Sequence, residues 1–120
     1  MQSTSWTLYL VETSAGNLYC GICTSLQRRF KEHAGNGKLC AKALRGKGPL
    51  TLKYASLVGD RSSALKTEYW LKQQNKKFKL ALIEGLKDLP QSPQRYSNED
   101  LNRIQIIAYQ VENESKQCRH

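Results

Sequence analysis

Acidic residues are scarce in this chain of 120 residues, which has 10 Asp and Glu against 19 Lys and Arg and a formal net charge of +9. The sequence also lacks an apolar run of about 18 residues, which argues against a membrane-spanning helix. Its first five residues, Met-Gln-Ser-Thr-Ser, have neither the charged nor the apolar segment of a signal peptide. We therefore expect a single cytoplasmic domain with a modest core, since 39% of the residues are hydrophobic.

Neither a disulfide framework nor a phosphate-binding loop is present. The spacing of Cys20, Cys23, Cys40 and Cys118 does not match a disulfide scaffold, and we expect these thiols to stay reduced in a cytoplasmic protein. The glycine-rich turn at residues 45–49 lacks the glycine spacing and the following Lys-Ser/Thr of a P-loop. The sequence therefore indicates neither a disulfide-stabilised secreted domain nor a P-loop nucleotide hydrolase.

Positive charge is concentrated in the first part of the chain. Residues 1–86 contain 14 of the Lys and Arg residues but 5 acids, whereas residues 87–120 contain five of each. A body of this charge attracts polyanions, so nucleic acid is the expected partner, with a ribosomal or membrane surface as a weaker alternative. Basic residues that only keep a small protein soluble would give the same composition. The candidate phosphate contacts are Lys38, Lys42, Arg45 and Lys47, together with Lys76 and Lys79.

Alternating hydrophobicity predicts a β-hairpin at the start of the chain. Trp6, Leu8 and Leu10 would face one side of a strand, and Thr7, Tyr9 and Val11 the other. Residues 18–23 form a second candidate strand, and a three-residue loop at 14–16 would place Gly16 in the left-handed conformation. Odd-numbered residues would then pair with each other, so Tyr9 and Tyr19 should share a face of the sheet.

Capping residues and apolar spacing predict helices after the hairpin. Ser25 should cap a helix that ends near Ala34, with Arg29 and His33 along one edge of its apolar stripe. Residues 50–58 alternate again and should form a third strand. Asp60 or Ser62 should cap the next helix, and a last helix should cover residues 78–83 before Gly85.

A single carboxylate, Glu68, stands in the second of these helices. Ala64, Leu65, Leu71 and the stem of Lys72 surround it at helical spacing, which predicts that it projects from the buried face. A buried charge costs several kcal/mol unless an arginine, a lysine or a metal ion neutralises it. Glu68 therefore needs a cationic partner.

The order of these elements and motifs resembles the GIY-YIG nuclease domain over residues 6–86. Thr7-Leu8-Tyr9 and Tyr19-Cys20-Gly21 are similar to the two motifs that name the family, and Arg28-Arg29-Phe30, His33 and Glu68 match its Arg, His and Glu. The segments 6–10, 18–22, 45–49 and 64–68 are most similar to the small stand-alone bacterial members. They also resemble the nuclease subunit of the eukaryotic structure-specific endonuclease. The resemblance implies an α/β (α+β) domain in which helices flank a three-stranded antiparallel sheet.

The resemblance also implies metal-dependent cleavage of DNA. Glu68 would hold Mg²⁺ or Mn²⁺, and Arg29 would clamp the phosphate with its planar guanidinium group. Tyr9 or Tyr19 would take the proton from the attacking water, and His33 would relay a proton or contact the phosphate. Two positions depart from the family pattern, since Thr7 replaces a glycine and Ile22 stands where some members have a polar residue.

Other interpretations of the same residues stay open from the sequence. The tyrosines could be core residues, and Arg29 could form a structural ion pair with Glu68. The protein could bind nucleic acid without turnover. It could also be a zinc-dependent binder through Cys20, Cys23, His33 and Cys40, although two strand cysteines an odd number apart should face opposite sides.

The last third of the chain lies outside the resemblance. We divide the chain into a nuclease-like domain at 1–86, a linker at 87–97 that contains two prolines, and an extension at 98–120. Ser97 or Asn98 could cap a helix in this extension, although residues 104–111 also fit a strand. A helix would carry a stripe of four apolar residues, namely Leu101, Ile104, Ala108 and Val111. The stripe would pack on the domain or bind a protein partner, and the polar residues 114–120 should fray.

No base-reading element is visible in the sequence. We therefore expect a DNA endonuclease that acts on branched, damaged or flexible DNA rather than at a defined sequence, with RNA as a further possible substrate.

Overall fold

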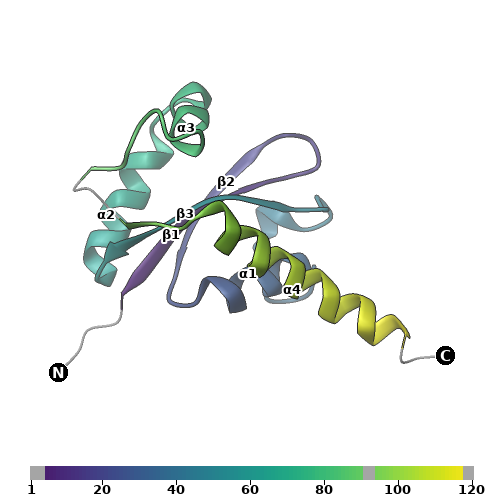
Figure 1. Cartoon of the computed structure of the whole chain (residues 1–120). Helices are drawn as coiled ribbons and strands as arrows, with labels where there is room; N and C mark the ends of the chain where they lie inside the picture. Colours follow the sequence, from purple (N-terminus) through teal and green to yellow (C-terminus); the bar gives the residue numbers. More distant parts are fainter. Residues whose placement is uncertain (1–4, 91–93, 118–120) are drawn as a thin grey trace.

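An antiparallel sheet with the strand order β2-β1-β3-β4 forms the centre of the computed structural model, which describes residues 5–90 and 94–117 and the side chains as far as Tyr109. The elements along the chain, shown in Figure 1, are β1 (Trp6–Glu12), β2 (Leu18–Cys23), α1 (Leu26–Ala34), the 3₁₀ turn η1 (Lys42–Leu44), β3 (Thr51–Gly59), α2 (Arg61–Lys72), α3 (Lys76–Ile83), β4 (Gln94–Arg95) and α4 (Asn98–Gln117).

The predicted three strands are present, but the sheet has a fourth strand that the sequence did not indicate. β4 pairs with Ser56 and Leu57 of β3 and lies inside the segment predicted to be a linker. Two residues are too few to show an alternating pattern, so only the pairing with β3 identifies them as a strand.

The hairpin has the predicted register. Tyr9 lies opposite Gly21, and Val11 lies opposite Tyr19, so odd-numbered residues pair with each other. The loop closes with a hydrogen bond of 2.9 Å from the Thr13 amide to the Asn17 carbonyl. Gly16 has φ +87°, the left-handed conformation that a three-residue hairpin loop requires.

Helices cover both faces of the sheet (Figure 1). On one face, α1 and α4 bury Leu26, Phe30 and Leu101 against the side of β1 that carries Tyr9. On the other face, α2 and α3 bury Leu71 and Leu82 against the side that carries Leu8 and Leu10. The two faces of β1 are therefore assigned as its alternating pattern predicted.

Strand β3 does not alternate regularly along its whole length. Leu10 pairs with Tyr54 and Val11 pairs with Leu52, so Lys53 is an extra residue in the ladder. As a result Leu52 and Ala55 both belong to the core under α1 and α4, whereas Tyr54 lies in the opposite core.

The predicted starts of α1 and α2 are confirmed, whereas α3 begins at Lys76, two residues before the predicted helix. The Ser25 hydroxyl accepts a hydrogen bond from the Arg28 amide at the start of α1, and the Asp60 carboxylate accepts one from the Ser63 amide at the start of α2. Residues 98–117 form a helix rather than a strand, and the Ser97 hydroxyl caps it through the Asp100 amide. Among the described residues, no helix is both long and apolar enough to cross a bilayer.

The described part of α4 packs back on the domain. Leu101 and Ala108 are buried in the core with α1 and β3, and Ile104 packs against it. The side chain of Val111 lies outside the described part of the chain. Residues 114–120 were predicted to fray, but the α4 backbone stays helical through Gln117, and residues 118–120 lie outside the described residues. The apolar stripe of α4 is thus used within the molecule as far as it is described.

Two polar side chains of α4 take the place of a neighbouring strand beside the first residues of β3. The Gln105 side-chain oxygen accepts a hydrogen bond from the Leu52 amide at 2.9 Å, and its nitrogen donates to the Leu52 carbonyl at 3.4 Å. The Tyr109 hydroxyl accepts from the Leu50 amide and donates to the Leu50 carbonyl. Backbone groups that β4 does not reach are satisfied in this way.

Replacing Gln105 by Ala should destabilise the fold, because the backbone amide and carbonyl of Leu52 lose their partners in a buried position. We expect the free energy of unfolding to fall by about 1–3 kcal/mol. Ile106→Ala is the matched control, since Ile106 follows directly on the same helix and is 58% exposed. Urea titrations of both variants measure the difference, and equal midpoints would contradict the proposed contact.

Candidate active site

Four of the predicted site residues meet on the α1 side of the sheet. Tyr9 of β1, Tyr19 of β2 and His33 of α1 form a cluster with ring centroids 5.7–6.3 Å apart. The Tyr9 hydroxyl lies 2.8 Å from His33 Nε2. Tyr9 and His33 are buried, at 2% and 1% exposed, whereas Tyr19 and Arg29 reach the surface.

Gly21 allows the tyrosine cluster to form. It lies opposite Tyr9 in the ladder, and the Tyr9 ring crosses the space above it. A Cβ atom added at Gly21 would lie 2.5 Å from the Tyr9 hydroxyl oxygen and 3.2 Å from a ring carbon of Tyr19. Any side chain at this position therefore displaces Tyr9, and the second motif requires glycine for this reason.

His33 is neutral and has a defined tautomer. The Ala41 amide donates to His33 Nδ1 at 3.4 Å, so the proton of the neutral ring sits on Nε2 and is donated to the Tyr9 hydroxyl oxygen. Burial lowers the pKa of His33 to about 4, and the positive charge of Arg29 adds to this effect. The predicted orientation of His33 toward the sheet is confirmed.

Tyr9 holds its own proton firmly in this state. Burial raises the pKa of Tyr9 well above its ordinary value, the neighbouring Tyr19 raises it further, and Arg29 opposes the shift through its charge and hydrogen bonding. Since His33 Nε2 is a donor, the Tyr9 oxygen is an acceptor in this pair, and its hydroxyl hydrogen can be donated elsewhere.

Arg29 has a partner that the sequence interpretation missed. Its Nη1 donates to the Glu32 carboxylate at 2.8 Å and to the Leu39 carbonyl at 2.7 Å. The alternative in which Arg29 forms a structural pair with Glu68 is therefore wrong. The spacing of Arg29 and Glu32, three residues apart on one helix, was the available signal.

Glu68 is less buried than we predicted from the apolar residues around it in the sequence. Its side chain is 18% exposed and pairs with Lys72 at 3.3 Å, four residues along α2. Leu65 is 41% exposed and does not belong to the buried stripe, which contains Ala64 and Leu71. Because Leu65 is apolar, we predicted that its side of the helix would be buried. That side of α2 faces solvent instead.

Strand β2 separates Glu68 from the tyrosine cluster. The Cys20 side chain lies in the core under α2 and α3, while the neighbouring Tyr19 faces α1. Burial raises the pKa of Cys20 to about 12, and the nearby charge of Glu68 contributes, which places this carboxylate on the Cys20 side. β2 is an edge strand, so both sets of groups lie beside one edge of the sheet.

A divalent cation of the hard class fits the residues present. Glu68 offers a partly exposed carboxylate, and Mg²⁺ or Mn²⁺ is commonly held by one or two carboxylates, waters and substrate phosphate. In the described ranges no three His, Cys, Asp or Glu side chains are grouped to form a cage for a metal ion. A single carboxylate of this kind suits a cation that is shared with the substrate.

The zinc alternative is wrong. Cys20 lies in the core under α2 and α3, whereas Cys23 and Cys40 lie in the core under α1 and α4. Burial also raises the pKa of Cys23 to about 11, which disfavours the thiolate that zinc would need. Cys20 and Cys23 face opposite sides, as their odd spacing predicted.

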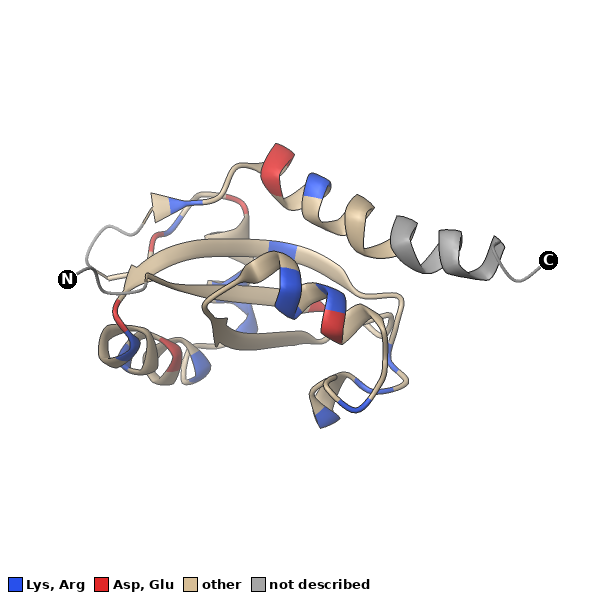
Figure 2. Ribbon diagram, turned by 90° about the horizontal axis from the view of Figure 1, so that it is seen from below, with Lys and Arg blue, Asp and Glu red and all other residues tan. Residues whose placement is uncertain are grey.

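The predicted basic residues fall into two groups. Figure 2 shows how Lys and Arg are distributed along the ribbon. Lys38, Lys42, Arg45 and Lys47 are exposed on the segment between α1 and β3. Lys76 lies instead next to the hairpin, where its ammonium group donates to the Gly16 carbonyl at 2.8 Å. Lys79 lies near Cys20, because its charge lowers the pKa of that thiol. Lys79 therefore belongs to the Glu68 side of β2.

Residues 5–81 of this chain match the family model described as "GIY-YIG catalytic domain". The chain belongs to the GIY-YIG family. It is 51% identical to the UPF0213 protein plu4503 of Photorhabdus laumondii over 83 residues. These residues cover 69% of this chain and 78% of that protein. It is also 51% identical over 81 residues to the UPF0213 protein YhbQ of Escherichia coli O1:K1, at 67% and 78% coverage. No solved structure gives a significant match.

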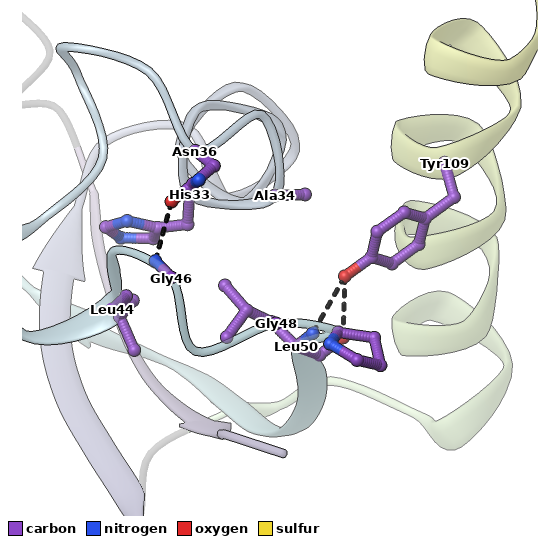
Figure 3. A pocket seen from close by; sticks show the side chains of 9 residues that line it. His33, Ala34, Asn36, Leu44, Gly46, Gly48, Leu50 and Tyr109 are labelled. Atoms are coloured by element: carbon purple, nitrogen blue, oxygen red, sulfur yellow. Dashed lines mark hydrogen bonds between the residues drawn. The ribbon is translucent and has the colours of Figure 1, made fainter.

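Helix α4 lies beyond the part of the chain that matches the GIY-YIG family, and it closes a hollow behind His33 (Figure 3). The hollow measures about 320 Å³ and lies between the end of α1, the segment before β3 and Tyr109. One wall is fixed by the hydrogen bond of 2.9 Å from the Gly46 amide to the Asn36 side chain. Because one wall comes from α4, motif spacing in the GIY-YIG segment could not predict this hollow.

Gly21→Ala should disrupt the GIY-YIG site from within. The added methyl group would overlap the Tyr9 hydroxyl, and overpacking of this kind typically costs about 1–3 kcal/mol of stability. Gly37→Ala is the matched control, because a Cβ at Gly37 meets nothing within 4 Å. Denaturant unfolding of both variants measures the cost. If Gly21→Ala unfolds at the same midpoint as Gly37→Ala, the close contact is not present.

The stability of the protein should depend on pH through His33. The folded-state pKa of about 4 lies below the ordinary value of 6.5, so the unfolded chain takes up this proton first as the pH falls. The contribution of neutral His33 is complete above pH 6.5, is lost progressively below it and levels off near pH 4. It amounts to about 3 kcal/mol. Unfolding free energies of the parent and His33→Gln from pH 7 to pH 4 should converge, and parallel curves would contradict this pKa.

Proposed function

We propose that this protein is a metal-dependent endonuclease that hydrolyses phosphodiester bonds in branched, damaged or flexible DNA. The observation that carries the proposal is the cluster of Tyr9, Tyr19, Arg29 and His33 beside the edge strand β2, with Glu68 on the other side of that strand. Membership of the GIY-YIG family supports it, because that family is described by its catalytic domain.

Glu68 and Arg29 would have separate roles, one toward the cation and one toward the phosphate. Glu68 would hold Mg²⁺ or Mn²⁺, which when bound supplies positive charge to the phosphoryl oxygens and makes bound water more acidic. Lys72 would have to release the Glu68 carboxylate, which is easy for a pair whose lysine is 54% exposed. Arg29 would contact the phosphate through the guanidinium N–H groups that Glu32 and Leu39 do not use.

A tyrosine hydroxyl would take the proton from the attacking water. A tyrosine has an ordinary pKa near 10 and holds its proton at neutral pH, so the role requires nearby positive charge. Arg29 already acts in this direction on Tyr9, and His33 stabilises the same oxygen as a donor. Tyr19 is the member of the pair that a substrate can reach without rearrangement.

The basic residues would hold the nucleic acid backbone around this site. Lys38, Lys42, Arg45 and Lys47 would contact phosphates on the α1 side, and Lys76 and Lys79 on the α2 side. Contacts of this kind attract any sequence, which agrees with the absence of a base-reading element. RNA would be attracted as well, so cleavage of both must be measured.

A second candidate is a nucleic-acid-binding module without turnover. The engagement of Arg29 with Glu32 and Leu39 favours it, because it occupies part of the guanidinium group that the nuclease needs. Incubation with single-stranded, duplex and branched DNA and with RNA, in Mg²⁺, in Mn²⁺ and in EDTA, separates the two. Cleavage that requires the cation supports the nuclease, and binding without cleavage supports the module.

Glu68→Gln should abolish cleavage and leave the fold intact. The substitution removes the charge that would hold the cation, and we expect cleavage to slow by orders of magnitude while DNA is still bound. Stability should change by less than about 1 kcal/mol, because Glu68 is paired with a lysine that is 54% exposed and pairs of this kind contribute little. Glu84→Gln, at the exposed end of α3, is the control. A Glu68→Gln variant that melts normally and still cleaves at the parent rate would remove Glu68 from the site.

A further inference from the structure

Helix α2 carries two exposed hydrophobic side chains next to the proposed metal ligand. Leu65 is 41% exposed and Tyr69 is 72% exposed. Residues four apart are neighbours on a helix surface, so the two side chains adjoin each other. Neither is used in the cores that hold α2 against the sheet, which contain Leu71 of this helix.

Glu68 lies between these side chains and Lys72. Spacings of three and four residues connect Leu65 to Glu68 and Tyr69, and connect both of these to Lys72. The four side chains therefore form one patch, which we call the α2 patch. The Lys72 ammonium group lies 3.3 Å from the Glu68 carboxylate within it. A nucleotide whose phosphate shares a cation with Glu68 would lie within reach of Tyr69 or Leu65, because these side chains adjoin Glu68 on the helix.

The charge around the α2 patch selects an anionic partner. Glu68 is the one acid in the sequences of α2 and α3, which together contain six basic residues. They are Arg61, Lys66, Lys72, Lys76, Lys77 and Lys79, and all but Lys79 are exposed. Two apolar side chains are too few for a stable protein interface, which needs roughly 800 Å² from each partner. A lone tyrosine among lysines instead resembles the stacking platforms of proteins that bind single-stranded nucleic acid.

We propose that the α2 patch binds an unpaired nucleotide beside the phosphodiester at Glu68, with its base stacked on Tyr69. The proposal rests on the proposed function, because that function is what places the phosphate at Glu68. It deepens that function, because a base inside a duplex is already stacked on its neighbours and cannot cover Tyr69. The substrate class is therefore nucleic acid with an unpaired nucleotide at the cleavage position.

Binding measured without turnover tests the proposal. Fluorescence anisotropy in EDTA gives the affinity for a labelled oligo-dT single strand and for a blunt duplex of equal length. Tyr69→Ala should weaken single-strand binding roughly 10-fold, the usual effect of losing one stacked base, and leave duplex binding unchanged. Tyr69→Phe keeps the ring and should bind like the parent. Leu86→Ala removes a side chain that is 73% exposed beyond α3 and should change neither affinity.

Three results would overturn the proposal. Unchanged single-strand binding in Tyr69→Ala would exclude stacking on this ring, and equal weakening for strand and duplex would indicate a backbone contact instead. A parent dimer in sedimentation that Tyr69→Ala converts to a monomer would make the α2 patch an interface between copies. The nuclease assignment fails separately, since a parent that binds through Tyr69 but never cleaves with Mg²⁺ or Mn²⁺ keeps the patch and loses the activity.

Discussion

The contact between Tyr9 and Gly21 is the constraint on which the site depends. The hairpin register sets these residues opposite each other, and the missing side chain gives the Tyr9 ring room to lie over the neighbouring strand. From there its hydroxyl reaches His33, whose own orientation is fixed by the Ala41 amide. A loop one residue longer or shorter would turn β2 over relative to β1 and place Tyr19 on the opposite face of the sheet from Tyr9. The loop length, the glycine and the histidine therefore form a single requirement.

Features that depend on neighbouring residues could be predicted from the sequence. The hairpin register followed from one loop length, and the shared face of Tyr9 and Tyr19 followed from the register. The starts of α1 and α2 followed from Ser25 and Asp60, which bond amides three residues ahead. In each case the information and the structure lie within about ten residues of each other. The motifs also indicated membership of the GIY-YIG family, which the match over residues 5–81 confirms.

Features that depend on competition or on distant segments could not be predicted. Arg29 could pair with Glu68 or with Glu32, and it forms an ion pair with Glu32, which lies on the same helix. Leu65 has a core residue type but stands on the outer side of α2, because Ala64 and Leu71 already define the inner side. β4 is recognised only by its bonds to β3, and the extra residue at Lys53 only by the ladder on both sides of it. Apart from the three-residue spacing of Arg29 and Glu32, none of these features has a signature in residue spacing.

The hydrogen bonds from α4 side chains to β3 limit how copies of this protein can associate. With Gln105 and Tyr109 bonded to Leu52 and Leu50, and β4 bonded to Ser56 and Leu57, one border of the sheet is closed within the chain. Over the described residues, the six-residue β2 is the longer of the two edge strands, since β4 has two residues, so a foreign strand would add at β2, beside the candidate site. Growth of the sheet from one molecule into another would bury that site. Self-association by strand addition and access of a substrate thus exclude each other in this architecture.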